Sequence, residues 1–366
     1  VMTCVLGMVV RREREIRAFV KTPFYRVVSS IALEGESFEG EWRAVEGSRY
    51  FQSPVLYKEN GFKKKEDAQK LICELSTQQP LICTVEKIER KKENKNPPLL
   101  FNLAELQNVC SKLFKISPDE TLSIVQDLYE KKLVTYPRTD ARVLSTAVAK
   151  EIYKNISGLR NYPQAGEAAQ GALELGAYKN IAKTRYTNDK QITDHYAIIP
   201  TGQGLGALKG LSLTAQRVYE TIVRRFLSIF YPPAVYQKVS LVTKMENESF
   251  FSSFKVLLSE GYLKIAANSF AKKSMAEASG KTPESEGEGE VSCDEALLAA
   301  LQKLKKGDIL NINGLGIKEG ETSPPKRYNS GSMILAMENA GQLIEDEDLR
   351  SQIKGSGIGT SATRAE

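Results

Sequence analysis

The feature that most constrains the fold is a β-type sequence that is interrupted by a long helical stretch. Residues 24–88 alternate between apolar and polar positions and are rich in β-forming residues, apart from a helical pattern at 65–75. The same alternation returns at 235–258, after a region with helical periodicity. Because an inserted domain must leave and re-enter its host, both β stretches are expected to belong to one domain. We therefore expect a multi-domain α+β chain.

The helical stretch has recognisable start and stop signals. A charged segment closed by two prolines, residues 90–98, is interpreted as a linker and a domain boundary. Ser117 and Pro118 stand where a helix N-cap and first helical residue are expected. Further helices are predicted at about 144–156 and 212–230, with two prolines ending the second. Outside the stretch, helices are predicted at 1–21, 294–305 and 332–338, and the Ser-, Gly- and Glu-rich residues 274–292 are expected to form a flexible loop.

Charge and cysteine content narrow the classes of function. The chain carries 51 Lys and Arg against 45 Asp and Glu, and its basic residues recur in short clusters along the sequence. Such clusters favour an extended phosphate track, although a solvated mixed-charge surface explains them equally well. No apolar run is long enough for a membrane helix and no signal peptide is recognisable, so we expect a cytoplasmic protein. Five scattered cysteines without a CxxC pair support neither a disulfide framework nor a zinc site.

The first candidate for chemistry is the segment "VTYPRTD" at residues 134–140. The phenol of Tyr136 is a weak nucleophile at neutral pH unless a cation or a base assists it. Arg138 is always charged and can grip phosphate oxygens with two nitrogens. Taken alone, this motif is also compatible with an ordinary surface turn.

Three further segments carry polar groups in suggestive places. His195 is the only histidine; it follows Asp194, which could fix its tautomer, and it precedes the apolar "AIIP". Lys326, Arg327 and Tyr328 precede a helix, as expected of a site that binds single strands. The glycine-rich "GSGIGTSATRAE" offers hydroxyls and backbone N–H groups to phosphate but is not a nucleotide-hydrolysing loop. The acidic run at 345–348 is interpreted as a solvated turn rather than a magnesium site.

These segments, in this order, resemble the type IA DNA topoisomerases, and most closely the topoisomerase III-like branch. The similar residues are "LYEKKLVTYPRTDARVLS", "TDHYAIIPTG", "YETIVRRFLSIFYPPA", "TSPPKRYNSGSMILAMENAG" and "GIGTSATRAE". The resemblance covers nearly the whole chain. It implies a toroidal body and an ATP-independent reaction: cleavage of one DNA strand through a 5′-phosphotyrosine link, strand passage and religation. The resemblance also implies that the protein is a monomer. Its implied partner is nucleoid or plasmid DNA, preferentially single-stranded.

The resemblance also implies roles for individual residues. Tyr136 would be the nucleophile and Arg138 its charge-stabilising partner. The implied DNA-binding residues are Thr139, Asp140, His195, Lys326, Arg327, Thr360, Thr363 and Arg364. The family's N-terminal Toprim domain, which carries the acidic Mg²⁺ site, has no counterpart in this sequence, so we expect no metal site within these residues. The chain alone is therefore expected to bind single-stranded DNA without relaxing supercoils. Tyr196 and Ser361 depart from the residues usual in this branch.

The resemblance suggests a division into three domains. Residues 1–22 and 266–366 would form a DNA-binding base domain, 23–97 and 233–265 a β-rich hinge or arch, and 98–232 a helical domain with the catalytic tyrosine. Two alternatives come from other classes. A tyrosine recombinase would need several separated arginines, one of them near a histidine. A non-catalytic single-stranded DNA-binding protein would need only the basic clusters.

Overall fold

The computed structural model describes residues 1–271, 291–292, 295–343, 357–361 and 363–364. The expected loop at 274–292 lies outside these ranges, except for a short strand at its end, and so does the acidic run at 345–348. No helix among the described residues is long and apolar enough to cross a membrane.

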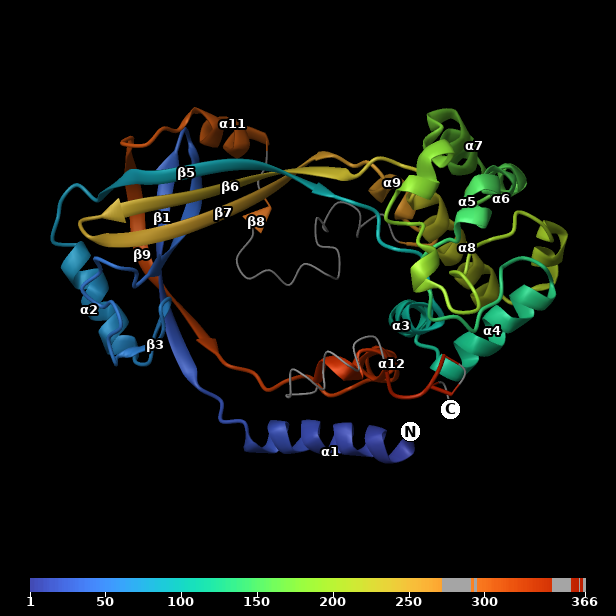
Figure 1. The fold of residues 1–366 in the computed structure, drawn as a ribbon. Coiled ribbons are helices and arrows are strands. Elements are labelled where there is room, and N and C mark those ends of the chain that lie inside the picture. The colour runs from blue at the N-terminus through green and yellow to red at the C-terminus, as the bar shows by residue number, and fades with distance from the viewer. Residues whose placement is uncertain (272–290, 293–294, 344–356, 362, 365–366) are drawn as a thin grey trace.

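The described residues form a mixed set of strands and helices (Figure 1). The strands are β1 (Pro23–Leu33), β2 (Glu36–Arg43), β3 (Leu56–Lys58), β4 (Gly61–Phe62), β5 (Ile82–Lys95), β6 (Ala234–Met245), β7 (Glu248–Ser259), β8 (Val291–Ser292) and β9 (Ile309–Glu321). The helices are α1 (Met2–Ala18), α2 (Lys65–Leu75), α3 (Leu103–Phe114), α4 (Pro118–Glu130), α5 (Thr146–Glu151), α6 (Tyr153–Gly158), α7 (Gly166–Leu175), α8 (Leu213–Ser228), α9 (Leu263–Ala266), α11 (Glu295–Lys303) and α12 (Ser330–Glu338). Short 3₁₀ helices are η1 (Leu159–Asn161), η2 (Ala177–Lys183), η3 (Asp189–Gln191), η4 (Leu205–Gly210) and η5 (Ala340–Leu343).

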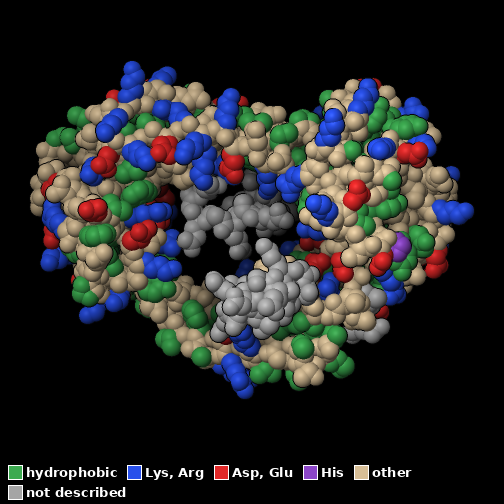
Figure 2. Space-filling model, in the orientation of Figure 1, with side chains coloured by type: hydrophobic (Ala, Val, Ile, Leu, Met, Phe, Trp, Pro, Cys, Tyr) green, Lys and Arg blue, Asp and Glu red, His purple; other side chains and the backbone are tan. Residues whose placement is uncertain are grey.

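These elements are arranged as a ring (Figure 1). Strands β1–β7 and β9, with α2 and α11, form one side, which we call the barrel unit. Helices α3–α8 form the other side, the helical unit. The long strands β5, β6 and β7 connect the two units along one edge, and α1 and α12 lie along the opposite edge. A space-filling view shows an opening at the centre of the ring, with Lys and Arg side chains along parts of its rim (Figure 2). The expected toroidal α+β body is confirmed.

The barrel unit is a closed antiparallel sheet. The strand order is β2-β7-β6-β5-β9-β1, and β1 pairs with β2 again, which closes the sheet on itself. Buried residues alternate along β1 and β2, as expected of barrel strands, and in β1 they include Val27, Ile31 and Leu33. Trp42, the only tryptophan, is fully buried there and stacks on Phe62. This hydrophobic core is separate from that of the helical unit.

The helical unit begins and ends its helices largely where the sequence predicts. Ser117 caps α4 by accepting a hydrogen bond from the backbone N–H of Glu120, with Pro118 in the first turn. Ser212 caps α8 in the same way, and this helix runs through the middle of the unit with its apolar face buried. The result is a rigid support for the loops between the helices, which carry the candidate site residues.

Two segments differ from the expectation. Residues 90–95, predicted as a linker, continue strand β5 and pair in register with β6, from Arg90 opposite Val239 to Lys95 opposite Ala234. Their side chains are charged because this part of the ribbon is solvent-exposed, but the partner strand still satisfies the backbone.

Strand β9 and helix α11, which the division at residue 266 assigns to the base domain, pack in the barrel unit. Leu310 and Ile312 turn into the barrel core, while β9 pairs with both β1 and β5. The domain boundaries as a whole stay a prediction.

The ring is closed where α12 lies against α3 (Figure 1). Gly331, at the start of α12, approaches α3 so closely that an added Cβ would lie 3.1 Å from Asn108 Cα and from Ser111 Cβ. The hydroxyls of Ser330 and Ser111 are 3.5 Å apart across this contact. Asn329 and Ser332 form a capping box that starts α12. The contact is partly polar, unlike the apolar cores of the two units.

Candidate active site

Tyr136 lies on an irregular loop, residues 134–144, that leads from α4 to α5. Its half-buried ring is held between two other rings. Tyr129 of α4 packs edge-on at 5.5 Å between centroids, and His195 lies at 4.3 Å with its plane tilted by 40°. The sequence therefore singled out two residues, Tyr136 and His195, that the fold places in direct contact.

Backbone pairing brings the two motifs together. The N–H of Thr135 donates to the carbonyl of Ile199 at 3.0 Å, and the hydroxyl of Thr135 donates to the carbonyl of Ala197 at 3.0 Å. Thr139 is 4% exposed, and its hydroxyl donates to the carbonyl of His195 at 2.8 Å. In this structure Thr139 contacts protein, and its predicted DNA contact stays a prediction. The buried "AIIP" segment thus fixes the position of the exposed His195.

One cation near Tyr136, the guanidinium of Arg138, has no salt-bridge partner among the described residues. Arg138 is half-buried; its Nε lies 3.5 Å from Gln126 Oε1, a long contact, and no ion pair to Arg138 is found within the described ranges. Its guanidinium can therefore take a phosphate without breaking a salt bridge. Asp194, considered as a partner for His195, makes no hydrogen bond with that ring in the part of the chain that the structure describes.

Asp140 and Arg364, both predicted to contact DNA, bind each other. Arg364 is only 8% exposed, and its Nη1 donates to Asp140 Oδ1 at 3.0 Å. Its other nitrogens donate to the carbonyls of Ile358 and Gly359. The carboxylate of Glu338 lies 3.9 Å away, and burial raises the pKa of this carboxyl. A DNA contact by Arg364 would require its release from this cluster.

Lys326 and Arg327 lie on the segment before α12, and residues of α1 hold this segment in place. Arg327 forms a two-bond ion pair with Glu13, with Nε 2.6 Å and Nη2 3.2 Å from the two carboxylate oxygens, and this pairing lowers the pKa of Glu13. Arg12 lies over the ring of Tyr328 at 4.1 Å. The structure therefore places these cations at the α1 edge of the ring, on a different segment from the loop of Tyr136.

Thr360 and Thr363 close a tight turn next to Arg364. The backbone N–H of Thr360 donates to Thr363 Oγ1 at 3.0 Å, and Gly359 adopts φ +70°. A free N–H cradle for phosphate was expected here, but the amide of Thr360 is used inside the turn. Both threonines are exposed, so their predicted DNA contacts stay predictions.

Sequence reasoning missed residues that act between segments. Asn102 and Glu338 join the loop of Tyr136 to α12, and Glu13 holds Arg327. Only Asn102 had a readable signal, since Asn three residues before Glu105 is typical of a helix N-cap. Arg327, the partner of Glu13, and Asn102, which donates to Glu338, lie 314 and 236 residues away in sequence, so no local pattern reveals either pair.

The described residues contain no group of three or more His, Cys, Asp or Glu side chains that could hold a metal ion. The Mg²⁺ that the resemblance implies therefore has no fitting ligand set among these described residues.

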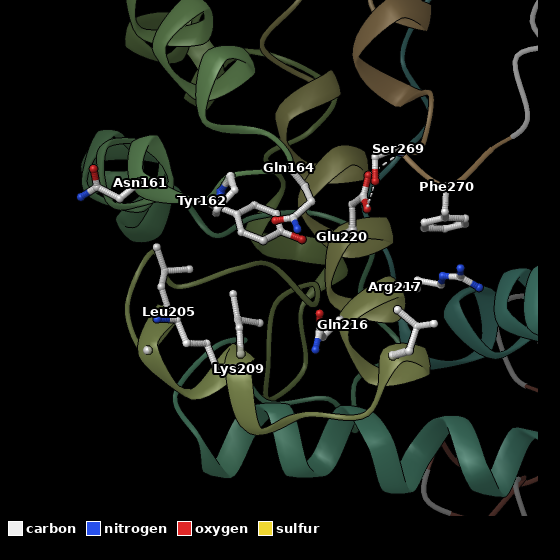
Figure 3. Close-up of a pocket in the computed structure, with 14 residues that line it drawn as sticks. Asn161, Tyr162, Gln164, Leu205, Lys209, Gln216, Arg217, Glu220, Ser269 and Phe270 are labelled. Atoms are coloured by element: carbon white, nitrogen blue, oxygen red, sulfur yellow. Dashed lines mark hydrogen bonds between the residues drawn. The ribbon is translucent and has the colours of Figure 1, made fainter.

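A cavity of about 620 Å³ lies elsewhere in the helical unit (Figure 3). Its wall includes Glu220, which is 3% exposed and accepts hydrogen bonds from Arg224 and from the backbone and hydroxyl of Ser269. Figure 3 shows the contacts between Glu220 and Ser269, with Phe270 nearby. None of the predicted site residues lines this cavity, so it is separate from the cluster around Tyr136.

Comparisons with known proteins show which family the chain matches. The family model for DNA topoisomerases matches residues 1–366. The chain is 31% identical over 370 residues to DNA topoisomerase 3 of Bacillus licheniformis and 30% identical over the same length to that of Bacillus subtilis. All of the chain is matched, but it spans 45% of each of these relatives.

A solved structure, full-length topoisomerase I from Thermotoga maritima, has the same fold. It matches 99% of this chain and 48% of its own chain with a TM-score of 0.61 and 22% sequence identity. The family match over the entire sequence establishes that the chain belongs to the type IA DNA topoisomerases.

Proposed function

We propose that this chain supplies the strand-cleaving tyrosine of a topoisomerase that acts on single-stranded DNA. The observation that supports this best is the position of Tyr136: a phenol that is fixed between two rings, partly accessible, and two residues from an arginine without a salt bridge among the described residues. Both a nucleophile and a cation for phosphate are thus presented on one loop.

The proposed reaction exchanges one phosphoester for another. The phenolic oxygen of Tyr136 attacks the phosphorus, the bond from phosphorus to the 3′ oxygen breaks, and that oxygen leaves as a hydroxyl after taking up a proton. The 5′ phosphate stays on the tyrosine until the reverse attack reseals the strand. Arg138 offsets the charge that develops on the phosphate oxygens, a role worth roughly 10²–10³ in rate for one preorganised donor. ATP is not needed, because the phosphotyrosine link preserves the bond energy.

The test is covalent capture of an end-labelled single strand by a longer protein that contains this chain. Tyr136→Phe should abolish the denaturant-resistant adduct and leave DNA binding within a few fold, since only the attacking oxygen is lost. Tyr129→Phe is the matched control, because it removes a neighbouring phenol and keeps the ring. An adduct in the first variant, or its loss only in the second, would reject Tyr136 as the nucleophile.

The second candidate is a non-catalytic single-stranded DNA-binding protein, which the rim of Lys and Arg favours (Figure 2). For the 366-residue chain alone we expect this behaviour: a monomer that binds single strands in preference to duplex and does not relax supercoiled plasmid. The logarithm of its affinity should fall with the logarithm of salt concentration, with a slope of about −0.7 per phosphate neutralised. Affinity without salt dependence would contradict the phosphate track, and relaxation by the chain alone would contradict its assignment as a binder.

A further inference from the structure

Four residues form a polar cluster across the place where the ring closes. Asn102 and Asp140 come from the helical unit and its tyrosine loop. Glu338 ends α12, and Arg364 follows the glycine-rich turn. Two hydrogen bonds cross the boundary: Asn102 Nδ2 donates to Glu338 Oε1 at 2.6 Å, and Arg364 Nη1 donates to Asp140 Oδ1 at 3.0 Å.

Asn102 connects this boundary to the tyrosine loop. It is 1% exposed and caps α3 by accepting a hydrogen bond from the N–H of Glu105 at 2.9 Å. The same side-chain amide that donates to Glu338 also donates to the carbonyl of Asp140 at 3.1 Å. The N–H of the next residue, Leu103, donates to the carbonyl of Thr139 at 3.1 Å. The start of α3 therefore holds the backbone three and four residues beyond Tyr136.

We propose that Glu338 is a positioning residue for Tyr136. When α12 is docked on α3, Glu338 acts through Asn102 on the backbone of Thr139 and Asp140. This inference rests on the function proposed above. Glu338 contacts neither Tyr136 nor its neighbouring rings, yet its acceptor oxygen sets the orientation of the amide that holds the loop. The tyrosine is then held in its attacking position only while the ring is closed, so chemistry is coupled to closure.

The acceptor oxygen, rather than the negative charge, carries this role. The Glu338 side chain is 22% exposed, and burial raises its pKa, so the surroundings favour the uncharged acid more than water does. Glutamine keeps an oxygen that can accept from Asn102, whereas alanine removes it. The pair Glu338→Gln and Glu338→Ala therefore separates the hydrogen bond from a general loss of packing.

Ring closure can be measured without DNA. Ser111→Cys and Ser330→Cys place two thiols where hydroxyls lie 3.5 Å apart, in a chain whose exposed Cys4 and Cys73 and whose Cys293 are replaced by Ser. The rate of disulfide formation with diamide then reports how often α12 is docked on α3. Glu338→Ala should slow crosslinking roughly tenfold, as expected for loss of a buried bond to a carboxyl, and Glu338→Gln should stay within about twofold.

A double-mutant cycle tests whether Glu338 acts through Asn102. Asn102→Ser keeps a hydroxyl that can cap α3 but removes the amide donor. The double variant Asn102→Ser/Glu338→Ala should crosslink no more slowly than either single variant. Additive effects, or crosslinking of Glu338→Ala at the parent rate, would overturn the proposal.

The link to Tyr136 is tested by single-turnover covalent capture at saturating DNA, in the longer protein. Glu338→Ala should lower the capture rate about tenfold with DNA affinity unchanged, and Glu338→Gln should restore it. Slower crosslinking with an unchanged capture rate would overturn the positioning role. If the parent protein itself captures no DNA, the proposed function fails instead, and the crosslinking results still decide whether Glu338 holds the ring closed.

Discussion

Gly158 offers a strong test of how the His195 segment is held beside Tyr136. This residue ends α6, and a Cβ added to it would lie 2.2 Å from the carbonyl oxygen of Gly202, at the end of the "AIIPTG" segment. Ordinary contacts begin at 3.4 Å, and both partners are backbone, so no rotamer change can relieve the clash. We expect Gly158→Ala to cost about 3 kcal/mol, the upper end of the usual range for overpacking.

Because the two units have separate cores, this loss of stability can be assigned to one of them. Trp42 is the only tryptophan and is buried in the barrel unit, so its fluorescence reports on that unit. Far-UV circular dichroism reports mainly on the helical unit. With a urea dependence of about 2 kcal/mol per molar, a loss of about 3 kcal/mol lowers the helical midpoint by about 1.5 M. The fluorescence midpoint should not move.

Gly206→Ala is the matched control, because an added Cβ there meets nothing within 4 Å. It should change the helical midpoint little. An equal shift for both variants, or a shift of the Trp42 transition with Gly158→Ala, would refute the close approach as the cause.

Three more outcomes are expected. Glu248 is fully buried and accepts hydrogen bonds from Trp42 Nε1, Ser48 Oγ and the N–H of Arg49 at 2.7, 2.7 and 3.0 Å. Glu248→Gln turns an amide group toward these donors. It should lower the free energy of unfolding, measured by Trp42 fluorescence, by about 3 kcal/mol. Burial raises the thiol pKa of Cys83 to about 11 and that of Cys110 to about 12, so both should resist a thiol-specific reagent at pH 8 while the exposed Cys4 and Cys73 react at once. The pKa of Glu338 is raised above 4.5 in the closed ring, so closure of the ring binds a proton. Closure should therefore be favoured as the pH falls through the range above 4.5 and disfavoured as the pH rises. Spin labels at positions 111 and 330 should show this change, and Glu338→Gln should abolish it.

Much of the fold could be predicted, because its signals are local. The cap of α4, the helical pattern of α8 and the alternation of β6 and β7 each depend on a few neighbouring residues, and each prediction is confirmed. The charged end of β5 was misread because its pairing with β6 comes from a strand far along the sequence, and charge alone resembles a linker. The packing of strand β9 in the barrel unit was not foreseen for the same reason, since its partners β1 and β5 lie far away in sequence.

The candidate site divides in the same way. Tyr136 and His195 were recognisable from their motifs, and the contact between their rings requires only that the two segments pair. The cluster of Asn102, Asp140, Glu338 and Arg364 depends on the meeting of α3, a loop, α12 and a turn, which no short stretch encodes. The predicted DNA contacts at Thr139 and Arg364 show most clearly what a motif leaves out. A motif contains the hydroxyl or guanidinium but does not reveal whether that group already binds another part of the protein.

The register of β5 against β6 has a consequence for how this architecture arose. Lys95, the last residue of β5, lies opposite Ala234, the first of β6. The chain thus leaves and re-enters the sheet at a single rung of the ladder, and everything between these residues is topologically the tip of one hairpin. A primitive barrel with a short reverse turn at this place could acquire the whole helical unit by one insertion event, without any change in strand pairing. The same rung offers protein engineers a graft point, where another module could be exchanged for residues 96–233 while the barrel keeps its native connectivity.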